Sequence, residues 1–98
     1  MEDILLVKLY DIYKGLLTEK QSQLFSSYYL LDLSLSEIAE VEGTSRQSVY
    51  DALKIVKQKL IDYENVLGIL DREEKLSSLL EEINDQDIKI KIKEILDK

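Results

Sequence analysis

The side chains best suited to chemistry gather in residues 44–60, and their types are those that bind nucleic acid. Arg46, Gln47 and Tyr50 lie at polar positions near the start of an expected helix. Arginine can pair bidentately with guanine and glutamine with adenine, while hydroxyls, lysines and first-turn N–H groups can hold phosphates. The candidate DNA-binding residues are Thr44, Ser45, Arg46, Gln47, Ser48, Tyr50, Lys54 and Lys57.

The charge of the chain is unevenly distributed around this segment. The net charge is −7, which on average repels phosphate. Residues 44–60 nevertheless hold four basic residues and one acidic residue, whereas residues 1–43 and 61–98 are each strongly acidic. Contact with DNA is therefore expected to be confined to the basic segment. A solvated helix face, with Tyr50 packed against a neighbouring helix, is the competing interpretation of the same residues.

The composition argues against several other classes of protein. Histidine and cysteine are absent, and with them the commonest general base, the commonest metal ligand and the best nucleophile. No apolar run reaches the roughly 18 residues needed to span a bilayer, and the first residues are acidic, unlike the basic start of a signal peptide. We therefore expect a cytoplasmic protein that is not an enzyme, with no cofactor, metal, membrane insertion or small-molecule substrate.

Two capped helices joined by a short turn are expected to position the basic segment. Ser34 and Glu37 have the spacing of a capping box, which begins a short helix that Gly43 ends. Ser45 is placed to cap the next helix, and the small side chain of Ala39 allows the two helices to cross closely. This is the pattern of a helix-turn-helix, whose second helix enters the major groove of duplex DNA. The buried stripe of that helix is expected to be Val49, Leu53, Val56 and Leu60.

Helical spacing of apolar residues predicts two further helices before this unit. The first is expected over residues 3–14, with Gly15 in a left-handed cap. Its buried stripe is expected to be Leu5, Leu6, Leu9, Ile12 and Tyr13. The second begins at a capping box, Thr18–Gln21, and is expected to end near Asp32.

The chain after Tyr63 is expected to stay helical and acidic, with an apolar stripe from Val66 to Ile83. A break is expected at Asn84–Asp85, followed by a last helix over residues 88–96, although its alternating first residues would alone suggest a strand. The sequence thus predicts an all-α fold, with a helix-turn-helix domain over residues 1–63 and an acidic helical extension over residues 64–98.

Four segments occur in an order that is typical of one protein family: Leu16–Gln21, Tyr28–Tyr29, Ser34–Glu40 and Ser45–Asp51. Together they resemble the YlxM family, small bacterial proteins associated with the signal recognition particle. The resemblance implies a fold like region 4 of bacterial sigma factors, without a winged helix and with additional C-terminal helices. It also implies a role near the signal-recognition GTPase.

The leading hypothesis is a regulatory DNA-binding protein of the signal recognition particle pathway. The main alternative is a protein-interaction module that binds the signal-recognition GTPase or its particle without binding DNA. Binding to the RNA of the particle through the same basic segment is a third interpretation. A homodimer is expected, because the apolar stripe after residue 63 lacks an obvious partner and helix-turn-helix proteins often pair to read two half-sites. A six-helix monomer in which that part of the chain folds back is the alternative.

Overall fold

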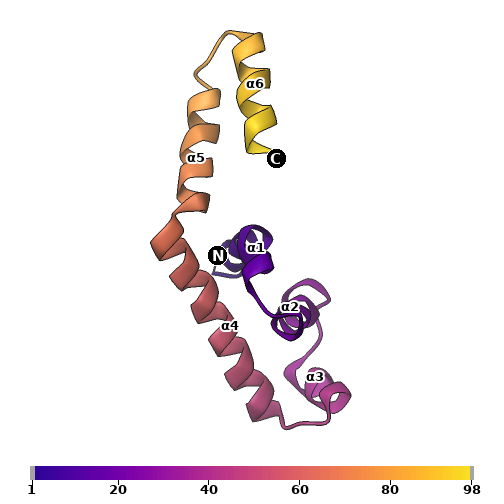
Figure 1. Cartoon of the computed structure of the whole chain (residues 1–98). Helices are drawn as coiled ribbons and strands as arrows, with labels where there is room; N and C mark the ends of the chain where they lie inside the picture. The colour runs from indigo at the N-terminus through magenta and orange to yellow at the C-terminus, as the bar shows by residue number, and fades with distance from the viewer. Residues whose placement is uncertain (1, 98) are drawn as a thin grey trace. The chain divides into compact units, whose positions relative to one another are not determined.

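The computed structural model describes residues 2–97, whose regular structure is helical, without a strand (Figure 1). The chain divides into two compact units, Met1–Leu67 and Gly68–Lys98. Tyr63, where the helix-turn-helix domain was expected to end, lies within the last helix of the first unit. The all-α prediction is confirmed. The helices are α1 (Glu2–Tyr13), α2 (Glu19–Phe25), α3 (Leu35–Glu42) and α4 (Arg46–Leu67) in the first unit, and α5 (Ile69–Leu80) and α6 (Gln86–Leu96) in the second.

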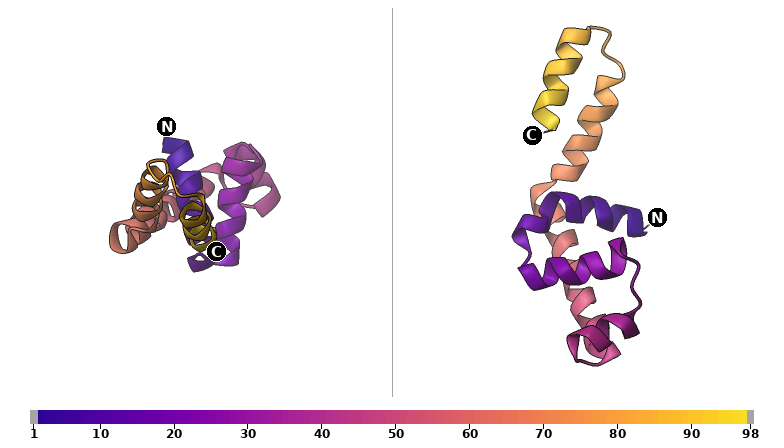
Figure 2. Two further views of the ribbon diagram at one scale, coloured as in Figure 1. Left: turned by 90° about the horizontal axis from the view of Figure 1, so that it is seen from above. Right: turned by 90° about the vertical axis from the view of Figure 1, so that its right-hand side faces the viewer.

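The first unit is organised around α4, because α1, α2 and α3 all pack against it (Figures 1 and 2). The buried residues of α4 recur at intervals of three and four, which places them on one face of the helix. No member of this stripe is more than 4% exposed. The predicted stripe is confirmed: it consists of Val49, Leu53, Val56 and Leu60.

A stack of aromatic rings fills the space between α1 and α2. The ring of Phe25 is fully buried and lies between those of Tyr10 and Tyr29, with centroid distances of 4.4 Å and 4.5 Å. Tyr13 is also buried, and its hydroxyl donates a hydrogen bond to Oε1 of Glu64 on α4 at 2.6 Å. Aromatic packing therefore fixes the first two helices on the scaffold that carries α4.

Two details of the N-terminal segment differ from the predictions. The inward residues of α1 are Leu6, Leu9 and Tyr13, whereas Leu5 is 47% exposed, because α1 is rotated so that Leu5 falls at the edge of its buried face. Gly15 lies in a 3-10 turn, Lys14–Leu16, and is not left-handed. The turn continues α1 with tighter winding, so no left-handed cap is needed there.

The second helix begins as predicted and ends with a feature that the sequence did not indicate. Thr18 and Gln21 form the expected capping box of α2. The helix then widens into a π-helical turn, Ser26–Leu30, before Asp32 adopts a left-handed conformation with φ of 59°. The expected end near Asp32 is confirmed. The π-turn sets the directions of the two tyrosines within it.

The second unit is a pair of short helices that follows a break at Gly68. Gly68 has a φ of 62°, which ends α4, so the prediction of continuous helix through this point was wrong. The predicted cap near Asn84–Asp85 is confirmed, because an Asp85 carboxylate oxygen accepts the backbone N–H groups of Asp87 and Ile88. The last helix is confirmed in preference to a strand.

The apolar stripe predicted for this part of the chain is only partly buried. Leu70 and Leu80 are each 7% exposed, whereas Val66 is 83% exposed. Leu79 and Ile95 are 50% and 74% exposed. Two short helices can cover only one narrow face of each other, so apolar side chains outside that face remain in solvent.

No helix within residues 2–97 is both long enough and apolar enough to cross a bilayer.

Candidate nucleic-acid interface

Local hydrogen bonds fix both ends of α3, the first helix of the helix-turn-helix. Ser34 Oγ accepts the N–H of Glu37 and Glu37 Oε1 accepts the N–H of Ser34, both at 3.0 Å. At the other end Gly43 is left-handed, with φ of 68°, and the N–H of Thr44 donates to the carbonyl of Ala39 at 3.0 Å. The predicted capping box and glycine stop are confirmed.

The capping box has a consequence that can be measured by titration. Hydrogen bonds from Ser34, the backbone bond being the stronger influence, lower the pKa of the Glu37 carboxyl below its ordinary value. Because the folded chain holds the ionised carboxylate more tightly, this contribution to stability is present above the ordinary pKa of glutamate. It is lost as the pH falls through the lowered value. We expect an NMR pH titration to give Glu37 a midpoint below the ordinary value of a glutamate side chain; a midpoint at that value would contradict the capping box.

The crossing of α3 and α4 is closed by a small apolar cluster. Ile38 and Ala39 of α3 and Val49 and Leu53 of α4 are all buried and in mutual contact. Half-buried leucines and the pair Tyr28–Tyr29 pack around this cluster. Since alanine contributes only a methyl group, the two backbones approach closely at this point. The helix-turn-helix geometry predicted from the sequence is therefore present, with its second helix held rigidly by the core.

The N-terminus of α4 is capped by serine hydroxyls that bond to each other. Ser45 Oγ accepts the N–H of Ser48 at 3.0 Å and donates to Ser48 Oγ at 2.9 Å. The predicted cap is confirmed. The hydroxyl of Ser45 is thus used within the turn, so a phosphate at this end would be met by the first-turn N–H groups, by the hydroxyl of Ser48, whose hydrogen these two bonds do not use, and by Thr44, whose side chain is exposed.

The candidate base-contacting and phosphate-contacting side chains lie along one flank of α4. Arg46, Tyr50 and Lys54 follow one another at four-residue intervals and are exposed, Tyr50 to 51%. Lys57 continues this flank and is half-buried. Lys59 falls on the opposite side of the buried stripe, given a rotation of about 100° per residue. The helix therefore gathers three of its four cations on the same side.

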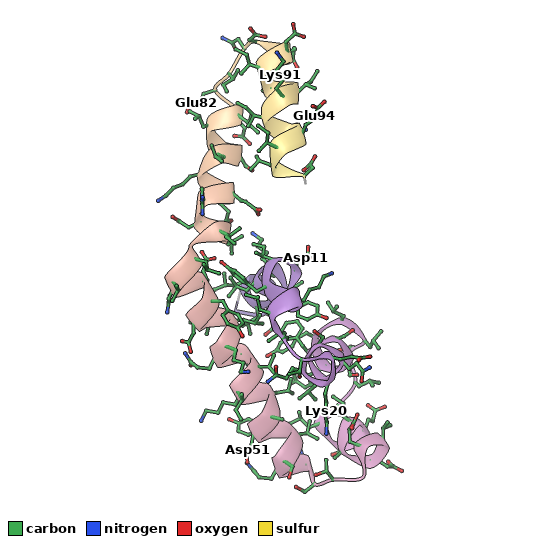
Figure 3. The ribbon with its side chains drawn as sticks, in the orientation of Figure 1. Asp11, Lys20, Asp51, Glu82, Lys91 and Glu94 are labelled. Atoms are coloured by element: carbon green, nitrogen blue, oxygen red, sulfur yellow. The ribbon has the colours of Figure 1, made fainter. Side chains whose placement is uncertain are left out.

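A hydrogen bond that the sequence analysis missed holds Gln47. Its Nε2 donates to Oδ1 of Asp51 at 3.0 Å. Figure 3 shows Asp51 on the side of α4 turned away from α1, α2 and α3. The four-residue spacing of a glutamine and an aspartate on an exposed helix face is the signal that could have predicted this pair. Asp51 places a negative charge beside the amide that was expected to bind adenine.

A groove that was also not predicted runs beside the same flank. We call it the tyrosine groove; it has a volume of about 320 Å³, and its lining includes Tyr28, Tyr29, Tyr50, Lys54, Lys57 and Ile61. A second hollow beside it shares Leu35 and Tyr50 and is also lined by Arg46 and Gln47.

Within the groove, Lys57 Nζ lies 6.0 Å from the centroid of the Tyr29 ring. Burial raises the pKa of Tyr29, and the Lys57 ammonium partly offsets that rise. The wall is thus both aromatic and cationic. Tyr50 faces this groove and is also exposed at the candidate interface. Packing beside neighbouring helices and contact with DNA are therefore compatible roles for its side chain.

The chemistry available at this surface is that of binding. It offers cations, an amide and tyrosine rings. Among residues 2–97, no three His, Cys, Asp or Glu side chains are grouped as metal ligands would be.

Comparison with known proteins identifies the family. Residues 2–98 match the family described as "Putative helix-turn-helix protein, YlxM / p13 like". The chain is 43% identical over 90 residues to a UPF0122 protein of Ureaplasma urealyticum serovar 10, covering 92% of this chain and 91% of the relative. It is 44% identical over 87 residues to a UPF0122 protein of Caldanaerobacter subterraneus, covering 87% of this chain and 74% of the relative. A relative from Halalkalibacterium halodurans is 47% identical over 77 residues, covering 79% and 71%. The chain therefore belongs to the YlxM / p13-like family of helix-turn-helix proteins.

Proposed function

We propose that this protein is a cytoplasmic DNA-binding regulator of the signal recognition particle pathway, and that the first half of α4 enters the major groove of duplex DNA. The observation that carries the proposal is the exposed flank of Arg46, Tyr50 and Lys54 on a helix held by a complete helix-turn-helix core. Base-reading side chains must be solvent-exposed and positioned by a rigid element, and this flank meets both conditions.

Each residue of the surface has a distinct role in this proposal. Arg46 and Gln47 read base edges, and Tyr50 contacts a base or sugar beside them. The phosphate contacts come from the turn and from the later part of the helix. They are made by Thr44, Ser48, Lys54 and Lys57, and by the backbone N–H of Ser45. A homodimer whose interface leaves this flank of α4 exposed would present two such helices to two half-sites.

The proposal is tested by titrating labelled duplex DNA with the protein at several salt concentrations and following fluorescence anisotropy. Three cations on the contact flank limit the slope of log K against log salt to about −2.7 per monomer, and to roughly twice that for a dimer. Lys54→Ala is expected to make the slope shallower by about 0.9. The matched control is Lys59→Ala, which removes a lysine from the other flank and should leave the slope unchanged.

Two results would contradict the proposal. One is the absence of binding even at low salt, and the other is equal loss of slope in both lysine variants. Replacing the duplex with the RNA of the particle separates DNA binding from the RNA interpretation. If the protein bound this RNA more tightly than duplex DNA, and if Lys54→Ala reduced the salt slope of RNA binding in the same way, the surface would be an RNA-binding surface.

Removing the acidic residue from this surface should strengthen binding. Asp51→Asn abolishes a negative charge that repels phosphate, and it weakens the bond that holds Gln47 at 3.0 Å. We expect the affinity for duplex DNA at low salt to rise by roughly fivefold, with a smaller gain at high salt. Asp62→Asn, which alters an equivalent Gln58–Asp62 pair about three turns further along α4, is the control. Equal gains in the two variants would show that net charge alone, and not this site, is responsible.

A second function is favoured by the exposed apolar side chains of α6. Ile88 and Ile95 are 47% and 74% exposed and lie seven residues apart, on one face of the helix. Such a face is typical of a docking surface for another protein, and the signal-recognition GTPase is the partner proposed from the family resemblance. Calorimetry with the purified GTPase would test this role. Ile88→Ser together with Ile95→Ser should abolish binding while DNA binding persists, and unchanged GTPase binding would contradict it.

A further inference from the structure

The connection between α5 and α6 is the most acidic exposed part of the second unit. Residues 77–88 contain four acidic residues and no basic residue. Glu81, Glu82 and Asp87 are exposed, and Leu79 and Ile88 beside them are 50% and 47% exposed. We call this set of five residues the acidic tip. Figure 3 shows Glu82 in the connection itself, whereas Glu94 projects from α6 away from it. The acidic tip therefore combines negative charge with apolar side chains in a short segment that contains the turn between α5 and α6.

The tyrosine groove of the first unit has the complementary chemistry. Its rim carries the exposed cation Lys54, with Lys57 further along the helix. Its wall is formed by tyrosine rings and by Ile61, which is 38% exposed. DNA phosphates can bind to the lysines, but they would leave the apolar wall of the groove exposed to solvent. A segment with both carboxylates and aliphatic side chains would use the lysines and the wall together.

We propose that the tyrosine groove binds the acidic tip of a second copy of this chain. The carboxylates of Glu81 and Glu82 approach Lys54 and Lys57 of the partner copy, and Leu79 or Ile88 covers the tyrosine wall. A second copy is favoured as the occupant because the same chain supplies a segment with the required charge and the required exposed apolar residues. The contact joins two different patches, so it closes as a dimer only when each copy binds the other reciprocally.

The proposed contact regulates the surface that binds DNA. Lys54 lies both at the rim of the groove and on the flank assigned to phosphate contact, so one copy of α4 cannot use it for a tip and for DNA at the same time. Self-association is therefore expected to weaken as duplex DNA is added. This competition rests on the proposed DNA binding, whereas self-association does not require it.

The test is sedimentation velocity of the full chain without DNA, at low salt and over a wide range of protein concentrations. We expect reversible self-association that weakens as salt rises. Lys54→Glu alone, and Glu81→Lys with Glu82→Lys, should each weaken association by at least about tenfold, because like charges then face each other. Combining all three substitutions restores opposite charges and should recover most of the lost association. Recovery on charge exchange distinguishes a direct contact from a change in fold or net charge.

Glu94→Lys is the control, since it makes the charge change of one of these two glutamate substitutions on α6 outside the acidic tip. It should leave self-association unchanged, and circular dichroism should show equal helix content in all variants. Any of three results overturns the proposal. The chain stays monomeric at every concentration, Lys54→Glu leaves self-association unchanged, or the combined variant does not recover self-association. Loss of DNA binding with intact self-association would count against the proposed function only.

Discussion

Replacing Phe25 with alanine is expected to lower the free energy of unfolding by about 3–5 kcal/mol. Phe25 has no exposed surface, and its ring is stacked against Tyr10 of α1 and against Tyr29 of the π-turn. Alanine would leave a cavity and would remove both ring contacts at once. Small domains have total stabilities of roughly 5–15 kcal/mol, so this one change would remove a large share.

Urea unfolding followed by circular dichroism measures this loss. Phe25→Leu is the matched control, because leucine keeps most of the buried volume while removing the aromatic stack. We expect it to cost less than half as much as Phe25→Ala. A loss below about 1 kcal/mol for Phe25→Ala would mean that the aromatic layer does not hold α1 and α2 together.

The same ring connects the core with the candidate interface. Tyr29, which stacks on Phe25, is also a wall of the tyrosine groove and the neighbour of Lys57. Without Phe25, the Tyr29 ring loses the stacking contact that fixes its orientation on the side facing the core. The aromatic layer therefore supports the groove as well as stability.

Features encoded by neighbouring residues were predictable from the sequence. The capping boxes at Thr18 and Ser34 each depend on two residues three positions apart, and the structure contains both. The buried stripe of α4 was predictable because its apolar residues recur at intervals of three and four along one face of the helix. Where residues close together in the sequence determine a helix start or a buried helix face, the sequence pattern predicts what the structure contains.

Features determined by tertiary packing were not predictable in this way. Gly15 and Gly68 are both glycines between helices, yet only Gly68 is left-handed. Nothing adjacent to either glycine distinguishes them, because the direction of the following helix decides the backbone conformation. Likewise the tyrosine groove depends on the π-turn that carries Tyr28 and Tyr29 to the side of α4. Their adjacency in sequence does not reveal that they share a wall with Tyr50.

Substituting Arg46 with alanine is expected to weaken binding to a preferred duplex sequence by about 1–3 kcal/mol, the discrimination attributed to one bidentate arginine–guanine contact. Arg46 is exposed in the first turn of α4, at the end of a flank that Tyr50 and Lys54 continue. Its side chain is not part of the apolar core, so the loss should appear in binding and not in stability.

Comparing Arg46→Ala with Arg46→Lys separates base reading from charge. Lysine keeps the positive charge but lacks the planar fork that makes two parallel hydrogen bonds. Under the base-reading role, Arg46→Lys should retain most of the affinity for random duplex DNA and lose the preference for the selected sequence. Arg46→Ala should lose both. If lysine restored full sequence preference, Arg46 would be a phosphate contact, and Gln47 and Tyr50 would be left as the candidates for base contact.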